Sequence, residues 1–131
     1  MLPDKIGAII LKSRKILLVS DDTTPFFWIP GGKVEPGEDH HGCLRRKLQE
    51  ELGVQLKHAK FYTTKTFLHE MAADTQMIHY YLLDIQRDPE PRSEITRMHW
   101  FSKEDFLKDE PKTTNVLREQ LLPMLIEEGL L

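Results

Sequence analysis

Short apolar runs separated by polar turns begin the chain. Two of these runs, over residues 5–11 and 15–20, flank the polar tripeptide Lys12-Ser13-Arg14. Apolar runs joined by so short a polar loop predict two neighbouring antiparallel strands. A third strand, short and aromatic, is expected over residues 26–29, and Pro30-Gly31-Gly32 should end it in an open turn.

A helix is predicted over residues 39–52, where the apolar spacing changes from strand-like to helical. Glu38 and Asp39 suit the positive end of the helix dipole, and Gly53 is a typical C-terminal stop. The face that we expect to be buried consists of Cys43, Leu44, Leu48 and Leu52.

The second half of the chain contains further strands and two helices. The strands are expected over residues 54–67 (interrupted), 77–86 and 98–101. Ser102 begins a capping box before a short helix, and a final helix over residues 114–128 should kink or break at Pro123. This order of elements predicts an α/β fold in which helices cover a mixed sheet.

Length and composition narrow the class of protein. The chain has 131 residues, 40% of them hydrophobic, so we expect residues 1–131 to form a single domain. Its 18 basic and 21 acidic residues give a net charge of −3 without a basic stripe, which argues against a nucleic-acid polymer as partner. Cys43 is the only cysteine, which excludes an intrachain disulfide and a zinc site built from cysteines.

No targeting or membrane-spanning pattern is found in the sequence. The first residues, Met1-Leu2-Pro3-Asp4-Lys5, lack the charged-then-apolar order of a signal peptide. No apolar run approaches the roughly 18 residues that a transmembrane helix needs. We therefore expect a cytoplasmic protein without a membrane partner.

Candidate chemistry concentrates in residues 32–54. Glu50 and Glu51 are adjacent near the end of the predicted helix, and the glycine-rich turn before that helix allows close backbone approach. Mg²⁺ is commonly held by one or two carboxylates and substrate phosphates, so the pair is a candidate cation site that a main-chain carbonyl could complete. The alternative is a solvated helix face, and the glutamate pair alone does not decide between the two interpretations.

The spacing across this segment is more specific than the glutamate pair. Gly32 is followed after five residues by Glu38, and after seven more by Arg46-Lys47-Leu48-Gln49-Glu50-Glu51-Leu52-Gly53-Val54. This pattern resembles the signature of Nudix hydrolases, Gly-x5-Glu-x7-Arg-Glu-U-x-Glu-Glu-x-Gly-U, where U is a bulky aliphatic residue. Eight of its nine specified positions match. The preceding Trp28-Ile29-Pro30 and the order of strands and helices are also similar to this family.

The resemblance implies a fold and a reaction. The fold would be an α/β/α sandwich with a mixed β-sheet between helices, and the reaction would be hydrolysis of a nucleoside diphosphate linked to another group, with Mg²⁺ or Mn²⁺ as cofactor. Carried over by position, Glu50 and Glu51 would be metal ligands, with the Gly32 carbonyl as a third. Arg46 would orient a glutamate of this cluster, and Glu38 would help to hold the loop to the helix.

The resemblance also implies roles for residues around the cluster. In many Nudix proteins a loop carboxylate from the region before the last strand reaches the metals, and Glu94 matches its position; the alternative for Glu94 is a solvated loop residue. A carboxylate of the site, with Glu50 and Glu94 as candidates, would position or deprotonate the attacking water. Gly53, like Glu38, would be a structural part of the signature.

Lys47 departs from the signature, because family members usually carry a glutamate there that is often a metal ligand or the catalytic base. A protonated lysine cannot act as a base, and its ammonium would attract Glu50 and Glu51 and compete with one cation. Three interpretations follow. The site works with fewer metals and another base, such as Glu94 or Glu35; or it binds nucleotides without fast turnover; or Lys47 is an engineered or chance substitution in an active enzyme.

The leading hypothesis is therefore a metal-dependent Nudix pyrophosphohydrolase that acts on a nucleoside diphosphate derivative or a nucleoside triphosphate. The rival hypothesis is a Nudix-fold nucleotide-binding or regulatory module whose catalysis Lys47 has weakened. A third is a house-cleaning enzyme for a modified nucleotide. ADP-ribose, dinucleoside polyphosphates and (d)NTPs all remain open as the small-molecule substrate. The family resemblance makes a homodimer one of the oligomeric states to expect.

Overall fold

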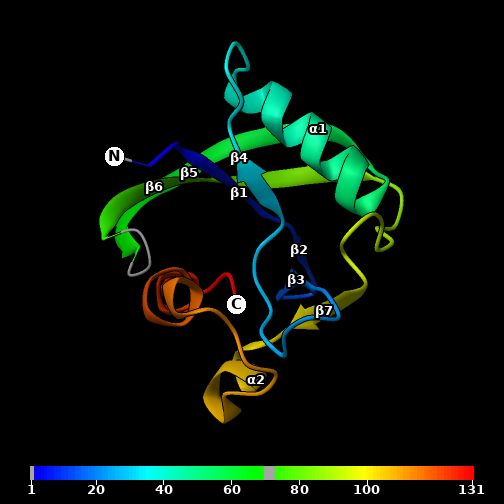
Figure 1. Ribbon diagram of the computed structural model, residues 1–131. Coiled ribbons are helices and arrows are strands. Elements are labelled where there is room, and N and C mark those ends of the chain that lie inside the picture. The colour runs from blue at the N-terminus through cyan, green and yellow to red at the C-terminus, as the bar shows by residue number, and fades with distance from the viewer. Residues whose placement is uncertain (1, 70–72) are drawn as a thin grey trace.

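A mixed four-stranded sheet lies between two helical layers in the computed structural model, which describes residues 2–69 and 73–131 (Figure 1). Across the sheet, the strands are β4 (Gly31–Lys33), β1 (Lys5–Ile9), β6 (Asp74–Gln86) and β5 (Gln55–His69). β1 runs parallel to β6, and the other neighbouring pairs are antiparallel. The predicted α/β fold with a mixed sheet is therefore confirmed.

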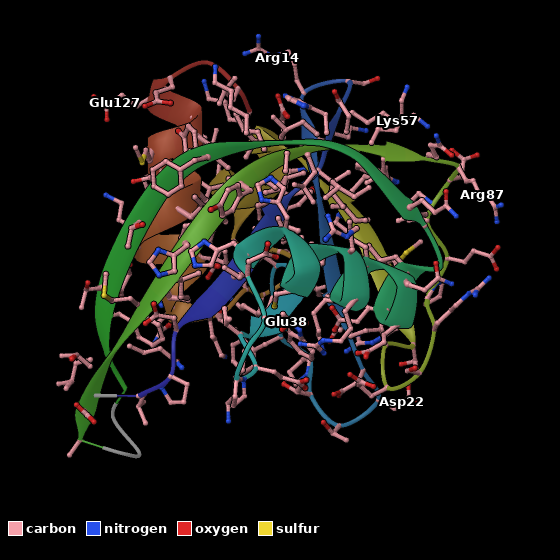
Figure 2. The ribbon with its side chains drawn as sticks, turned by 90° about the horizontal axis from the view of Figure 1, so that it is seen from above. Arg14, Asp22, Glu38, Lys57, Arg87 and Glu127 are labelled. Atoms are coloured by element: carbon pink, nitrogen blue, oxygen red, sulfur yellow. The ribbon has the colours of Figure 1, made fainter. Side chains whose placement is uncertain are left out.

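Each face of this sheet has its own hydrophobic core. α1 (His40–Leu52) lies across one face, as Figure 2 shows from above, and it buries the four predicted residues Cys43, Leu44, Leu48 and Leu52. A C-terminal helix covers the other face; it consists of the π-helical turn η1 (Leu117–Leu121) and α3 (Leu122–Glu127). Alternation along β6 serves both cores, because Tyr81 and Leu83 face α1 whereas Ile78 and Tyr80 face the C-terminal helix.

A second sheet of three strands lies beside the first. Its order is β2 (Leu11–Lys12), β3 (Lys15–Ser20) and β7 (Arg97–Phe101), and α2 (Lys103–Lys108) follows β7. The predicted pairing of the first two apolar runs is only partly right, because the first run divides at Ile10. Both edges of β1 are occupied, by β4 and by β6, so only the two residues of β2 are left to pair with β3.

The strand expected over residues 26–29 is displaced. Phe27 and Trp28 make only isolated bridges, and the regular strand is β4, at the two glycines that should have formed an open turn. Glycine is required there because β4 runs very close to β1. A Cβ atom at Gly31, whose φ is 141°, would lie 2.0 Å from the Ile6 carbonyl oxygen.

The helices begin and end at residues that the sequence predicts. Asp39 caps α1 by accepting the Gly42 N–H at 2.6 Å, and Gly53 ends it with a φ of 64°. Ser102 forms the predicted capping box of α2. Pro123 lies in the first turn of α3, directly after the π-helical turn, as expected where proline interrupts the hydrogen-bond pattern. Across residues 2–69 and 73–131, no helix has the length and apolar character that spanning a membrane requires.

Candidate active site

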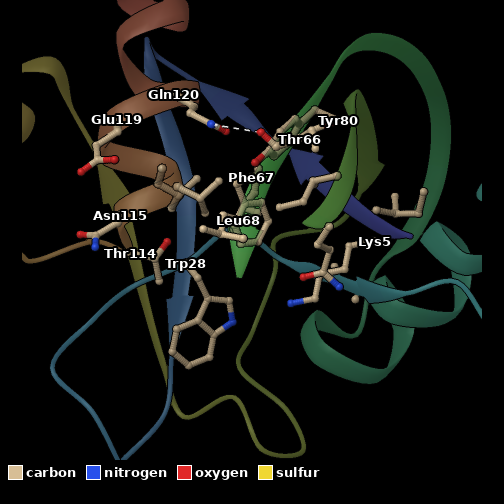
Figure 3. A pocket seen from close by; sticks show the side chains of 18 residues that line it. Lys5, Trp28, Thr66, Phe67, Leu68, Tyr80, Thr114, Asn115, Glu119 and Gln120 are labelled. Carbon is tan, nitrogen blue, oxygen red and sulfur yellow. Dashed lines mark hydrogen bonds between the residues drawn. The ribbon is translucent and has the colours of Figure 1, made fainter. Parts of the chain in front are cut away.

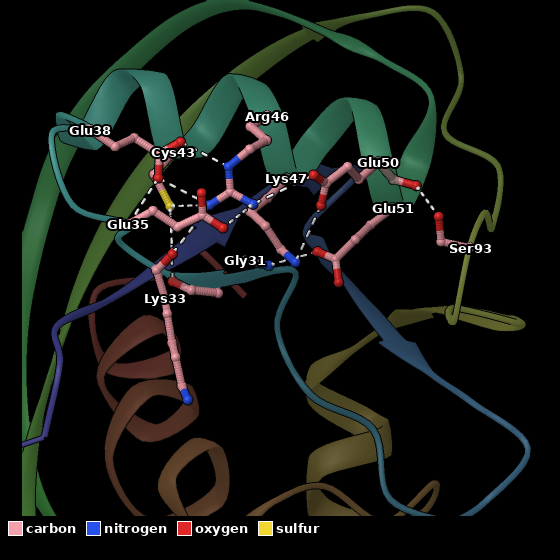
Figure 4. Close-up of polar contacts among 11 residues, drawn as sticks. Gly31, Lys33, Glu35, Glu38, Cys43, Arg46, Lys47, Glu50, Glu51 and Ser93 are labelled. Carbon is pink, nitrogen blue, oxygen red and sulfur yellow. Dashed lines mark hydrogen bonds and ion pairs between the residues drawn. The ribbon is translucent and has the colours of Figure 1, made fainter.

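Three glutamates contact the guanidinium group of Arg46, in the middle of α1 (Figure 4). Its Nε and Nη2 donate to the two carboxylate oxygens of Glu38 at 2.8 and 3.0 Å. Its Nη1 lies 3.5 Å from Oε1 of Glu50 and 3.7 Å from Oε1 of Glu35. The hydrogen bonds from Arg46 and from the Glu35 backbone lower the pKa of Glu38 to about 2. Arg46 thus ties the loop before α1 to the helix and contacts the first glutamate of the candidate metal pair.

Lys47 lies between α1 and β4. Its Nζ is 3.6 Å from Oε2 of Glu50, and its side chain is only 17% exposed, against 47% for Glu50. The aliphatic part of the side chain passes so close to Gly32 that a Cβ atom there would lie 2.8 Å from Lys47 Cε. The departure from the signature is therefore built into the packing of the site.

Glu51 is a buried carboxylate, with 4% of its surface exposed. Its Oε1 accepts a hydrogen bond from the Gly31 N–H at 3.1 Å. Burial raises the pKa of Glu51, and the charges of Glu94 and Glu50 raise it further, while the ammonium of Lys47 and the hydrogen bond from Gly31 act in the opposite direction. The pKa is raised overall, which means that the ionised carboxylate is only partly stabilised by its surroundings. A cation beside Glu51 would stabilise the ionised form further.

The loop that contains Glu94 is fastened to the C-terminal end of α1. The Arg92 N–H donates to the Glu51 carbonyl oxygen at 2.9 Å, and the Ser93 hydroxyl donates to the Glu50 carbonyl oxygen at 3.2 Å. Gly53 lies against the Arg92 guanidinium group, and its φ of 64° is a left-handed conformation that glycine adopts without strain. These contacts bring the exposed Glu94 within electrostatic range of Glu51.

The donor groups near Glu51 suit a cation that has few protein ligands. Glu50 and Glu51 offer two carboxylates, and Mg²⁺ commonly takes one or two carboxylates and completes its shell with water and phosphate oxygens. In the part of the chain that the structure describes, no three His, Cys, Asp or Glu side chains are grouped to hold a metal ion. The backbone of Gly31 contacts Glu51, whereas the Gly32 carbonyl oxygen lies 4.0 Å from Cys43 Sγ.

A pocket of about 860 Å³ opens between the sheet and the C-terminal helix (Figure 3). Its volume lies within the roughly 300–1,000 Å³ typical of small-molecule sites. Trp28, Ile78 and Leu117 contribute apolar surface, and Gly31 and Gly32 also line it. The two glycines of β4 therefore border both the carboxylates of α1 and the pocket.

The sequence alone does not identify the polar side chains of the pocket, which are Lys5, Thr66, Gln76, Thr114, Asn115, Glu119 and Gln120. One signal was available for Gln76. It lies on the same strand face as Ile78 and Tyr80, so it is a polar residue at an inward-facing position. Tyr80 and Trp28 also line the pocket; Tyr80 is fully buried, whereas Trp28 is half-buried.

Comparison with known proteins gives a consistent result. The family model described as NUDIX domain matches residues 1–123. CTP pyrophosphohydrolase of Escherichia coli (strain K12) is 32% identical over 78 residues, which cover 56% of this chain and 55% of that protein. Diphosphoinositol polyphosphate phosphohydrolase 2 of Rattus norvegicus is 34% identical over 99 residues, which cover 72% of this chain and 53% of that protein. The chain spans about half the length of these curated relatives.

The fold is likewise similar to solved structures. The crystal structure of MutT NUDIX hydrolase from Burkholderia pseudomallei superposes with a TM-score of 0.75 at 25% sequence identity. The match covers 90% of this chain and 95% of that chain. The α/β/α arrangement is thus shared over nearly the whole length of both proteins.

The burial of Glu51 predicts that Glu51→Gln stabilises the fold at neutral pH in the presence of EDTA. The pKa of Glu51 is higher in the folded state than in the unfolded state, so the fold loses stability as the pH rises from the unfolded-state pKa through the folded-state pKa. A glutamine does not ionise and avoids this loss. The glutamine oxygen also keeps the bond from Gly31. We expect the Tm at pH 7.5 to rise by roughly 2–5 °C, the shift for about 1 kcal/mol in a domain of this size, and the gain to shrink at acidic pH.

Thermal unfolding of the parent, Glu51→Gln and Glu50→Gln, followed by circular dichroism at several pH values, tests this prediction. Glu50→Gln removes an exposed carboxylate that is paired with Arg46 and Lys47, so it should give no gain. Equal Tm changes in the two variants would contradict the cost assigned to burial.

Proposed function

Because this chain belongs to the NUDIX family, we propose that it hydrolyses a pyrophosphate bond in a nucleoside diphosphate derivative or a nucleoside triphosphate, with Mg²⁺ or Mn²⁺ as cofactor. The observation that supports this proposal most strongly is the position of Gly31 and Gly32. One donates its N–H to Glu51, the other lies against Lys47, and both line the pocket. A substrate whose base or sugar occupies the pocket would extend its phosphates past β4 toward the carboxylates of α1.

Each residue of the site has a proposed role. Glu50 and Glu51 would bind the cation, with the Gly32 carbonyl as the proposed third ligand and Gly31 as the backbone nearest to Glu51. When bound, the cation would neutralise charge on the bridging phosphates and lower the pKa of the attacking water. Arg46 would keep Glu50 in position through its contacts with both Glu38 and Glu50.

Glu94 is the proposed base in preference to Glu35. Glu35 lies 3.7 Å from Arg46 Nη1, where its charge is partly compensated. The charge of Glu94, in contrast, acts on Glu51 from the loop that is fastened to the end of α1. An exposed carboxylate within electrostatic range of Glu51 is well placed to orient a water molecule and accept its proton.

The alternative function is a nucleotide-binding or regulatory module with weakened catalysis. The observation that favours it is Lys47, whose ammonium lies 3.6 Å from Glu50 and favours the ionised form of Glu51 without any metal. This ammonium supplies part of the positive charge that a divalent cation would supply. Both functions need nucleotide affinity, so the property that separates them is turnover of the bound nucleotide.

We further propose that residues 1–131 form a single domain, that the protein is a cytoplasmic homodimer and that nucleic-acid polymers are not among its partners. The net charge of −3 supports a small nucleotide as substrate in preference to a polymer. The identity of the nucleotide depends on the pocket, because the signature residues face the phosphates.

The proposed hydrolysis is tested by a nucleotide panel that includes (d)NTPs, ADP-ribose and dinucleoside polyphosphates. Phosphate is measured after a coupled phosphatase or pyrophosphatase, with and without Mg²⁺ or Mn²⁺. We expect metal-stimulated release from at least one class of nucleotide. Nucleotide binding without any metal-stimulated release would support the binding module instead.

The assignment of the metal ligands predicts that Glu51→Gln lowers the rate on the best substrate at least tenfold, because it removes a charged ligand. The same variant is expected to be more stable than the parent, so unfolding would not explain the loss. Glu127→Gln, an exposed change in α3, is the control and should leave the rate unchanged. Equal rates for Glu51→Gln and the parent would overturn the assignment.

Lys47→Glu is expected to raise activity and Mg²⁺ affinity together, since it replaces a competing cation with a third carboxylate. Initial rates across a Mg²⁺ titration give both quantities in one experiment. Lys57→Glu, at an exposed position in β5, controls for the change in net charge. If neither quantity increases, Lys47 is an adapted part of the site.

A further inference from the structure

The pocket contains polar groups that the protein leaves without partners. Within the described residues, four buried side-chain atoms have no hydrogen-bond partner: Gln76 Oε1, Tyr80 Oη, Thr114 Oγ1 and Gln120 Oε1. All four residues line this one pocket, and Figure 3 shows Tyr80, Thr114 and Gln120 around it. Buried polar groups are normally satisfied, so four of them around one cavity indicate a ligand with complementary polar groups.

The two glutamine oxygens are acceptors by necessity. Gln76 Nε2 donates to the Pro3 carbonyl oxygen at 3.0 Å, and Gln120 Nε2 donates to the Thr66 carbonyl oxygen at 3.4 Å. A carbonyl oxygen only accepts hydrogen bonds, so each amide must turn its NH₂ group toward the backbone. The free atom of each side chain is therefore the oxygen, which needs a donor on the ligand.

The two amides bond to backbone on either side of β6, since Pro3 precedes β1 and Thr66 lies in β5. Thr66, which receives the Gln120 amide, pairs in the sheet with Met77, the residue next to Gln76. Gln76 itself is 2% exposed, so its free oxygen has no access to bulk water as an alternative partner. Two unpartnered acceptors, one from β6 and one from the C-terminal helix, thus line the same pocket.

The remaining polar groups discriminate less between ligands. Burial raises the pKa of Tyr80, so its hydroxyl stays protonated and can donate or accept, as can that of Thr114. Lys5 is a donor, but its backbone pairs with that of Lys33 and so places it at the β4 edge of the pocket. Its ammonium suits the phosphates of a substrate better than its base.

We propose that the pocket selects a nucleobase that bears an exocyclic amino group, as in cytosine or adenine, through Gln76 and Gln120. This inference rests on the proposed function for the nucleotide and adds the class of base. An amino group donates through its N–H groups and so complements a free glutamine oxygen. The oxo group of uracil or hypoxanthine in the same position would instead set one acceptor against another and leave both unpaired, which is the arrangement that rejects an analogue most strongly.

Binding of nucleoside monophosphates tests the inference without any need for turnover, because these ligands contain no pyrophosphate bond. Calorimetric titration of the parent with CMP, UMP, AMP and IMP gives two matched pairs that differ in an amino or an oxo group. We expect the amino member of at least one pair to bind at least tenfold more tightly than its oxo partner. Equal affinities within both pairs, tighter binding of UMP and IMP, or no binding of any of the four would overturn the inference.

Gln76→Met and Gln120→Met identify the groups responsible, since methionine keeps the length of the side chain and removes the acceptor. Each variant should reduce the amino-to-oxo affinity ratio to threefold or less, chiefly by weakening the amino ligand. Gln86→Met, an exposed change at the far end of β6, is the control and should keep the parental ratio. A parental ratio in both pocket variants would overturn the role of the glutamines.

The design separates this inference from the proposed function. Gln76→Met loses its bond to Pro3, and if it does not fold, Gln120→Met still decides the outcome. Selective binding of the amino nucleotides without hydrolysis would contradict the proposed function alone. Hydrolysis of several nucleotides with equal affinities in both pairs would contradict the base selectivity alone.

Discussion

The close approach of β4 to its two neighbours determines how the candidate site is arranged. At Gly31 the backbone lies so near β1 that a Cβ atom would come within 2.0 Å of the Ile6 carbonyl oxygen, and at Gly32 it lies against the side chain of Lys47. At Gly31, where the close neighbour is backbone, only glycine allows this approach. As a consequence, one short strand separates the carboxylates of α1 from the pocket beneath the C-terminal helix, and a phosphate chain would have little distance to cross between them.

The local features of the fold were predictable from the sequence, and the long-range ones were not. α1, its cap at Asp39 and its end at Gly53 depend on residues close in sequence, and all agree with the structure. The division of the first apolar run at Ile10 depends on β6, far along the chain, which occupies an edge of β1. The pocket could not be predicted for the same reason, since Gln76 and Gln120 come to line one pocket only through the packing of β6 and the C-terminal helix.

The charges of Lys47 and Glu51 give the site features of both a structural ion cluster and a metal centre. A buried carboxylate such as Glu51 is costly unless positive charge lies nearby, and Lys47 supplies some of that charge permanently. A site compensated in this way folds without a metal and has less free negative charge to attract one. The strength of cation binding at Glu50 and Glu51 therefore decides between an active pyrophosphohydrolase and a nucleotide-binding relative.

The most direct test of a single site on both sides of β4 is an amide NMR spectrum of the protein with CMP and a trace of Mn²⁺. Paramagnetic relaxation should weaken the signals of Gly31, Glu50 and Glu51, while the nucleotide shifts those of Tyr80 and Gln120. Both effects in the same sample would place the cation and the base on either side of the strand. Loss of signal on another face, or nucleotide-induced shifts away from the pocket, would contradict this arrangement.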